Sequence, residues 1–231
     1  MLLLGIFALS GPTGAEARYR MERPVEEMSF RVINKVIVVE ASIDGVSGYF
    51  LLDTGVRRLT LNARLFSRAR RATGLYLSDL NGVARRAEAV PVRVFRWGSL
   101  WRKDFAAHII ELETQERVLG CPLLGLIGQE VFREVELEVD YDARRLRLFR
   151  LDAEGRRRQH SSRPPDHTLP FTLEHHLPTF EVEVGPGRRL RVGIDSGASI
   201  NVLDQLWKRK LAPYALDRRT LSFNAALSTR D

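Results

Sequence analysis

Two segments of the sequence carry the same short pattern, and this repeat restricts the fold more than any other feature of the chain. Residues 48–55 read GYFLLDTG and residues 191–197 read RVGIDSG, so each is an apolar run that ends in Asp, then Thr or Ser, then Gly. A turn sequence precedes each run. An internal repeat of this kind indicates a duplicated structural unit. We therefore expect Asp53 and Asp195 at equivalent positions of two related halves.

The rest of the chain favours β-structure. From Ser29 onward, short aliphatic and β-branched runs are separated by Gly, Asn and Pro, which is typical of strands joined by turns. Asn81-Gly82 is the strongest hairpin signal, and Asp44-Gly45 is another. One brief basic helix is expected over residues 63–72. The predicted fold class is all-β.

A polar, Pro-containing stretch at residues 159–165 (QHSSRPP) is the best candidate for a linker between the two halves. Four segments are predicted from it: a signal peptide at 1–17, a first lobe at 29–151, a linker at 152–166 and a second, partial lobe at 167–231. The second half looks incomplete, because the chain ends soon after residues 221–224.

The amino terminus has the features of an export signal. Residues 2–9 (LLLGIFAL) are apolar, and Ala15-Glu16-Ala17 has the small-x-small pattern of a signal-peptidase site. The apolar run is far shorter than the roughly 20 residues that a membrane-spanning helix needs. We expect an exported protein, periplasmic or secreted, without a stable membrane span.

Composition excludes several other classes of protein. The net charge is +7, but the arginines are scattered and are not interleaved with stacking aromatics, so nucleic-acid binding is not expected. Cys121 is the only cysteine, which rules out an intrachain disulfide and a multi-cysteine metal site. His175 and His176 are adjacent and are expected in a surface loop. We expect no metal and no cofactor.

The paired aspartates suggest a specific chemistry. In an Asp-Thr-Gly or Asp-Ser-Gly loop, Gly permits close backbone approach, and the hydroxyl of Thr54 or Ser196 can bond the neighbouring loop. Two carboxyls that meet cannot both ionise, so they share one proton. The ionised carboxylate can then take a proton from a bound water, while the protonated one polarises a carbonyl. This pair predicts hydrolysis without a covalent intermediate.

At these residues the chain resembles the pepsin-like and retropepsin-like aspartic proteases, especially the bacterial ones. The resemblance implies a closed β-barrel lobe, duplicated, with peptide or protein as substrate. It identifies Asp53 and Asp195 as catalytic, and it implies support of the two loops by Thr54, Gly55, Ser196 and Gly197. It also implies a flap over residues 75–87, with Tyr76, Asn81 and Gly82 at the substrate. Further matches are the apolar-apolar-Gly element at 126–128, a short helix at 129–133 and closing strands at 139–142 and 146–148.

Val56 and Arg57 depart from the family pattern, which has small or polar residues after the first loop. A cation there is expected to favour the ionised form of Asp53. Three functions stay open on the sequence. The first is an aspartic endopeptidase with an Asp53–Asp195 pair in one chain, and the second a homodimeric protease that uses Asp53 from two chains. The third is an inactive, protease-like module that binds peptides.

Overall fold

The structure is a computed structural model, and it describes residues 18–66, 71–79, 84–157, 166–174, 176–202, 207 and 227–229. The predicted signal peptide (1–17) lies outside the described residues, so export stays a prediction. The predicted flap tip, Asn81 and Gly82, also lies outside them. Among the described residues no helix is both long enough and apolar enough to cross a bilayer.

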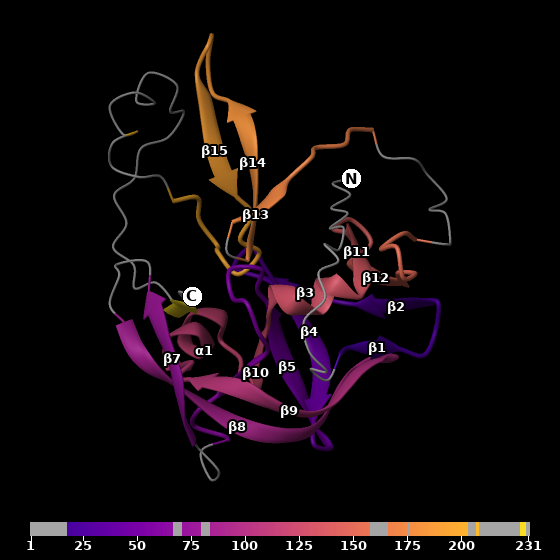
Figure 1. The fold of residues 1–231 in the computed structure, drawn as a ribbon, viewed down its shortest axis with the longest axis vertical. Coiled ribbons are helices and arrows are strands. Elements are labelled where there is room, and N and C mark those ends of the chain that lie inside the picture. The colour runs from indigo at the N-terminus through magenta and orange to yellow at the C-terminus, as the bar shows by residue number, and fades with distance from the viewer. Residues whose placement is uncertain are drawn as a thin grey trace.

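The described chain is mostly strands, as Figure 1 shows. The strands are β1 (Arg20–Met21), β2 (Val25–Ser29), β3 (Arg31–Ile33), β4 (Val36–Ile43), β5 (Val46–Leu52), β6 (Thr60–Asn62), β7 (Arg71–Asp79), β8 (Ala84–Trp97), β9 (Leu100–Ile110), β10 (Gly125–Ile127), β11 (Val135–Asp140), β12 (Arg145–Arg150), β13 (Thr172–Glu174), β14 (Leu177–Glu183), β15 (Arg189–Gly193) and β16 (Leu227–Thr229). The helices are α1 (Glu113–Leu119) and the 3-10 turn η2 (Gln129–Arg133). The predicted all-β class is confirmed.

Six of these strands close a barrel. Their order is β9-β6-β10-β5-β4-β8, and β8 pairs back with β9, which leaves no open edge among the six. The pairs β5–β10 and β6–β9 are parallel, and the other pairs in the ring are antiparallel. Closure removes the unpaired backbone groups that an edge strand exposes. The predicted closed β-barrel lobe is thus present.

Two tight turns set the register at the start of the barrel. Asn34 and Lys35 have positive φ angles of 48° and 71°, and Asp44 and Gly45 have 48° and 87°. Two consecutive residues of positive φ are typical of the turn that best matches the twist of a hairpin. The first of these turns joins β3 and β4 into a hairpin, and the second joins β4 and β5.

The predicted basic helix over residues 63–72 is wrong wherever the structure describes it. Residues 63–66 form a turn, and Arg71 already lies in β7. The turn closes because the backbone N–H groups of Leu65 and Phe66 both donate to the carbonyl of Asn62. Conversely, α1 was not expected. It ends at Gly120, whose φ of 65° gives the left-handed helix end that glycine favours.

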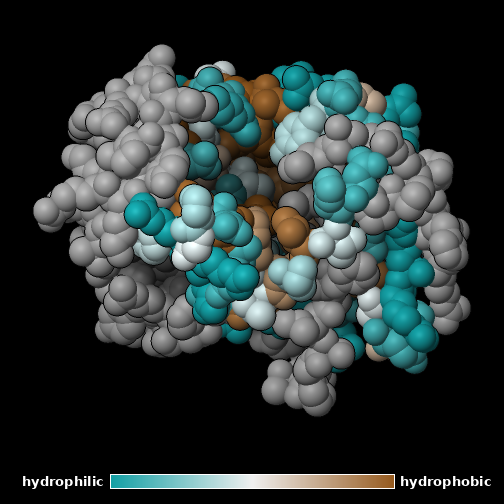
Figure 2. Space-filling view, turned by 90° about the horizontal axis from the view of Figure 1, so that it is seen from above, coloured by the Kyte–Doolittle hydropathy of each residue, from teal (hydrophilic) through white to brown (hydrophobic). Residues whose placement is uncertain are grey.

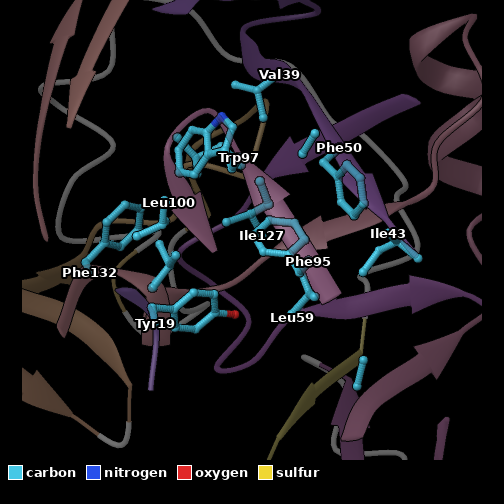
Figure 3. Packing of buried hydrophobic residues seen from close by; sticks show 14 of the residues in the cluster. Tyr19, Val39, Ile43, Phe50, Leu59, Phe95, Trp97, Leu100, Ile127 and Phe132 are labelled. Atoms are coloured by element: carbon cyan, nitrogen blue, oxygen red, sulfur yellow. The ribbon is translucent and has the colours of Figure 1, made fainter. Parts of the chain in front are cut away.

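The barrel interior holds the main hydrophobic core, shown in Figure 3. Phe95 lies at its centre, fully buried, and packs edge-on against Tyr19 and Phe50 with ring centroids 6.1 and 5.8 Å apart. Trp97 and Phe132 are buried in the same cluster. Aromatic side chains of this size each remove a large apolar area from water. The core therefore fixes β5 and β10, the strands from which the first Asp loop and its support begin.

A second sheet, of order β11-β12-β2, holds a cluster of ion pairs between arginines and glutamates. Arg147 contacts Glu27 and Glu138, and Arg157 lies 2.8 Å from Glu136. Glu136 and Glu138 are buried, so their charges need these partners. Much of the basic composition here neutralises the protein's own acids.

The second half forms a three-stranded sheet, β13-β14-β15, that projects from the barrel in Figure 1. Its antiparallel order repeats β3-β4-β5, and each set leads into an Asp loop. The duplication inferred from the sequence is therefore present at the level of the sheet. Within the described residues, the other strand of this half is β16, which pairs with β7. The predicted domain boundaries, including the linker at 152–166, stay predictions.

Candidate active site

The two Asp loops have the same internal geometry. The backbone N–H of Gly55 donates to Oδ1 of Asp53 at 2.9 Å, and the N–H of Gly197 donates to Oδ1 of Asp195 at 2.9 Å. A backbone turn follows in each loop, with N–H donors to the Asp carbonyls at Val56 (3.3 Å) and Ala198 (3.2 Å). In both loops, therefore, the sequence Asp-Thr/Ser-Gly orients the carboxylate through the same local hydrogen bond.

Four hydrogen bonds join the two loops reciprocally. The Thr54 N–H donates to Ser196 Oγ at 3.0 Å, and the Ser196 N–H donates to Thr54 Oγ1 at 2.9 Å. The hydroxyls in turn donate at 2.8 Å, Thr54 to the carbonyl of Ile194 and Ser196 to the carbonyl of Leu52. Each hydroxyl therefore accepts one bond and donates another. This arrangement locks the strands that lead into Asp53 and Asp195 at a fixed separation.

Each glycine provides the space that the opposite aspartate occupies. A Cβ on Gly55 would lie 2.7 Å from Cγ and both carboxyl oxygens of Asp195, and a Cβ on Gly197 would lie 2.3 Å from Cγ of Asp53. Neither glycine is among those of positive φ. Glycine is needed at both positions for close approach and not for backbone conformation. The structure thus brings the two predicted aspartates together.

The two carboxyls differ in their surroundings. Asp53 is only 6% exposed, whereas Asp195 is exposed. Burial, then the charge of Asp195 and the hydrogen bond with it, raises the pKa of Asp53 from its ordinary value of 3.8 to about 8. Backbone N–H donors on Gly55 and Val56 oppose this rise without cancelling it. The buried member is the one that keeps a proton near neutral pH.

The net shift at Asp53 is opposite to the one expected from a neighbouring cation. The pKa of Asp53 is raised, and its largest cause is desolvation, followed by Asp195. The pKa of the buried His108 imidazole is lowered, mainly by burial and then by the charges of Arg58 and Arg57.

The apolar-apolar-Gly element supports the first loop from behind, as predicted. Strand β10 pairs in parallel with β5, and the carbonyl of Ile127 accepts the Asp53 N–H at 3.0 Å. A Cβ on Gly128 would lie 2.6 Å from the carbonyl oxygen of Arg58. Gly128 therefore lets the chain pass under the loop. The short helix predicted after it is η2, and the predicted closing strands are β11 and β12.

A partly buried acid behind the loop, Glu130, was not recognised in the sequence. Glu130 Oε1 accepts from the Leu59 N–H at 3.0 Å, from Arg102 Nη1 at 3.0 Å and from the Tyr19 hydroxyl at 3.3 Å. Arg102 and Tyr19 are both buried. The network ties the end of the Asp53 loop to β9 and to the chain before β1. Its members are far apart in the sequence, so no local pattern marks them.

His176, expected in a surface loop, is instead buried at the site. It is 8% exposed, and its Nε2 lies 2.9 Å from the carbonyl oxygen of Gly55. It occupies the turn between β13 and β14, where its N–H donates to the carbonyl of Glu174. The repeat gave no signal for it, since the equivalent turn before β4 holds the exposed Lys35. His175 lies outside the described residues.

The predicted flap is the β7–β8 hairpin. Tyr76 pairs with Arg86 within it, and the register shifts between Ala72 and Tyr76. The structure does not describe the side chain of Tyr76, so its substrate role stays a prediction. The face shown in Figure 2, viewed from above, is hollowed at its centre, where apolar atoms lie below hydrophilic ones.

No group of three or more His, Cys, Asp or Glu side chains that could hold a metal ion is found in the described part of the chain. Cys121 is partly buried against the smaller hydrophobic cluster, and burial raises the pKa of its thiol. A thiol with a raised pKa is a poor nucleophile.

Three comparisons with known proteins bear on this site. Residues 39–131 match the model of a protein family described as aspartyl protease. The matched stretch includes the Asp53 loop and the strands β7, β8 and β10. This part of the chain is similar to the aspartyl proteases. The second Asp loop lies outside the matched residues, so its likeness to the first depends on the geometry above.

Among solved structures, the chain is similar to a retropepsin-like aspartic protease from Rickettsia conorii. The match has 19% sequence identity and a TM-score of 0.39, and it covers 58% of this chain and 96% of the Rickettsia chain. The comparison with curated proteins found no match.

Proposed function

We propose that the protein is an aspartic endopeptidase that activates water between Asp53 and Asp195 of a single chain. The observation that carries this proposal is the reciprocal packing of the two loops, in which each glycine makes room for the opposite carboxyl. Turns built from Asp, Ser and Gly are common, so a turn role alone could explain either loop. It does not explain why the two loops pack against each other. The match of the first half to aspartyl proteases supports proteolysis in general.

The different burial of the two carboxyls supports a division of roles. Asp53, with its pKa raised to about 8, carries the shared proton and directs it at the carbonyl oxygen of the scissile peptide. Asp195 is the exposed member and acts as the carboxylate that takes a proton from water. The water oxygen bonds to the carbonyl carbon, and the carbonyl oxygen takes the proton of Asp53. The tetrahedral intermediate then collapses: its C–N bond breaks, the proton now on Asp195 goes to the leaving amine nitrogen, and one hydroxyl returns its proton to Asp53 as the C=O bond re-forms.

The contacts favour this pair over one made of two Asp53 residues. The Thr54 N–H and hydroxyl, which a second copy of the loop would need, are already bonded to Ser196 and Ile194 of the same chain. A homodimer of that kind requires the β13-β14-β15 sheet to leave the site. Measuring the mass of the active species in solution separates the two arrangements.

Hydrolysis of an unfolded protein substrate by four proteins tests the proposal: the wild type, Asp53→Asn, Asp195→Asn and Asp142→Asn. Loss of a catalytic carboxyl is expected to lower kcat by at least about 100-fold in both site variants. Asp142→Asn is the control, since Asp142 is exposed in the turn between β11 and β12. Pepstatin, a peptide that carries a transition-state-like hydroxyl, is expected to inhibit the wild type. Unchanged hydrolysis in both site variants would exclude the pair, and no hydrolysis by the wild type would favour the peptide-binding module.

A further inference from the structure

The hydrogen bond between His176 and Gly55 is a contact at the site that the duplication does not explain. The imidazole is buried, and its Nε2 lies 2.9 Å from the Gly55 carbonyl oxygen. A carbonyl oxygen only accepts, so Nε2 carries the hydrogen and donates. The contact links a turn of the second half to the catalytic loop of the first.

The Gly55 carbonyl belongs to a peptide group that acts on Asp53. The N–H of the same peptide is that of Val56, which lies 3.3 Å from the Asp53 carbonyl oxygen and also acts on the Asp53 carboxyl as a hydrogen-bond donor. A peptide whose carbonyl accepts a bond has a more polar N–H, because hydrogen bonds in a chain reinforce one another. The imidazole therefore both orients this peptide and strengthens its donor.

The equivalent position in the first half is occupied differently. In the repeat, the turn between β3 and β4 corresponds to the turn between β13 and β14, so Lys35 stands where His176 stands in the second half. Lys35 is exposed. An otherwise reciprocal pair of loops thus has a buried donor behind the Asp53 loop, the loop whose carboxyl is buried.

We propose that His176 is a positioning residue, which holds the Gly55–Val56 peptide by donation from Nε2 and so fixes the Asp53 carboxyl against Asp195. This inference rests on the proposed function for its kinetic consequence, but the contact itself can be tested without catalysis. The required property is a donor at the Nε2 position. A Gln side chain places an amide N–H at a similar distance from the backbone, whereas Leu fills the space without a donor.

The kinetic test compares His176→Gln, His176→Leu and the matched control Lys35→Gln with the wild type. Loss of one buried hydrogen bond is expected to lower kcat by about five- to tenfold in His176→Leu, with KM little changed. His176→Gln is expected to keep most of kcat, and Lys35→Gln all of it. Circular dichroism establishes that each variant is folded. A folded His176→Gln as impaired as His176→Leu would overturn the proposal, as would an unimpaired His176→Leu.

The second readout does not need activity. Amide hydrogen exchange of Val56, measured by NMR, is expected to be faster in His176→Leu than in the wild type and unchanged in His176→Gln. Equal Val56 exchange in all three proteins would overturn the proposal, whatever their rates of hydrolysis. If the wild type hydrolyses nothing, the proposed function fails, but Val56 exchange still decides whether His176 holds the loop.

Discussion

Thr54 and Ser196 exchange two hydrogen bonds across the candidate site, each hydroxyl accepting the backbone N–H of the other residue. Both hydroxyls also donate to carbonyls of the opposite strand. Because every donor and acceptor in this group is used, neither loop can shift without breaking bonds to the other. The separation of Asp53 and Asp195 is thus a property of both halves together.

Removal of one hydroxyl is expected to loosen the pair of loops. Ser196→Ala loses the acceptor for the Thr54 N–H and the donor to Leu52, which should lower the free energy of unfolding by about 1–3 kcal/mol. Hydrolysis should fall with it. Thr54→Ser keeps its hydroxyl and is expected to stay close to the wild type. Urea unfolding measures the stability of both variants, and Ser199→Ala in the same loop is the control. A Ser196→Ala variant as stable as that control would contradict the account.

Filling the space at Gly197 is expected to separate the carboxyls. The methyl group of Gly197→Ala would lie 2.3 Å from Cγ of Asp53, so the carboxyl must move. A displacement of about 1 Å in a catalytic group can cost on the order of 100-fold in rate. Gly187→Ala is the control, because a Cβ there meets nothing within 4 Å and only its φ of 66° is unfavourable. Equal kcat values for the two variants would refute the close approach of Gly197 to Asp53.

The raised pKa of Asp53 makes stability depend on pH in a defined direction. Between the ordinary value of 3.8 and about 8, the folded protein holds a proton at Asp53 that the unfolded chain releases. The free energy of unfolding should therefore fall as pH rises through this window, at a rate of no more than about 1.4 kcal/mol per pH unit. Asp53→Asn should flatten that dependence, and Glu40→Gln, on the exposed side of β4, should not. Urea unfolding at pH 5 and pH 8 measures this dependence in the wild type and the two variants. A stability that rises equally over this range in all three proteins would contradict the prediction.

Glu130 is expected to matter for folding far more than a surface acid. Glu130→Gln leaves the buried guanidinium of Arg102 without its charge partner, which should cost about 3–5 kcal/mol. Glu113→Gln breaks the exposed pair with Arg117 and should cost under about 0.5 kcal/mol. Chemical denaturation of both variants measures the difference. Similar midpoints would show that the network behind the Asp53 loop is not tightly held.

The parts of the fold that follow local rules could be predicted from the sequence. Asp44-Gly45 forms the expected tight turn, because few other residues accept two positive φ angles in succession. Gly128 was recognised in the sequence together with the strand before it. The structure explains why glycine stands there, since the backbone of Arg58 leaves no space for a side chain. Asp53 and Asp195 were found by the repeat of strand, acid, hydroxyl and glycine.

The parts that depend on long-range contacts could not be predicted. Asp53 is buried and Asp195 exposed, although their local sequences are nearly the same. That difference arises from the surrounding structure, and so does the burial that raises the pKa of Asp53. His176 and Glu130 contact the Asp53 loop from distant segments, and the residue types alone do not distinguish them from surface His and Glu.

The central claim is that Asp53 and Asp195 hold one proton between them, and NMR titration of their carboxyl carbons tests it most directly. With ¹³C-labelled aspartate, and Asp53→Asn and Asp195→Asn for assignment, the Asp53 carbon is expected to titrate with a midpoint near pH 8 in the wild type. In Asp195→Asn the midpoint should fall, because the neighbouring charge is gone. Two carboxyls that titrate independently near pH 4, each unaffected by replacement of the other, would contradict the account.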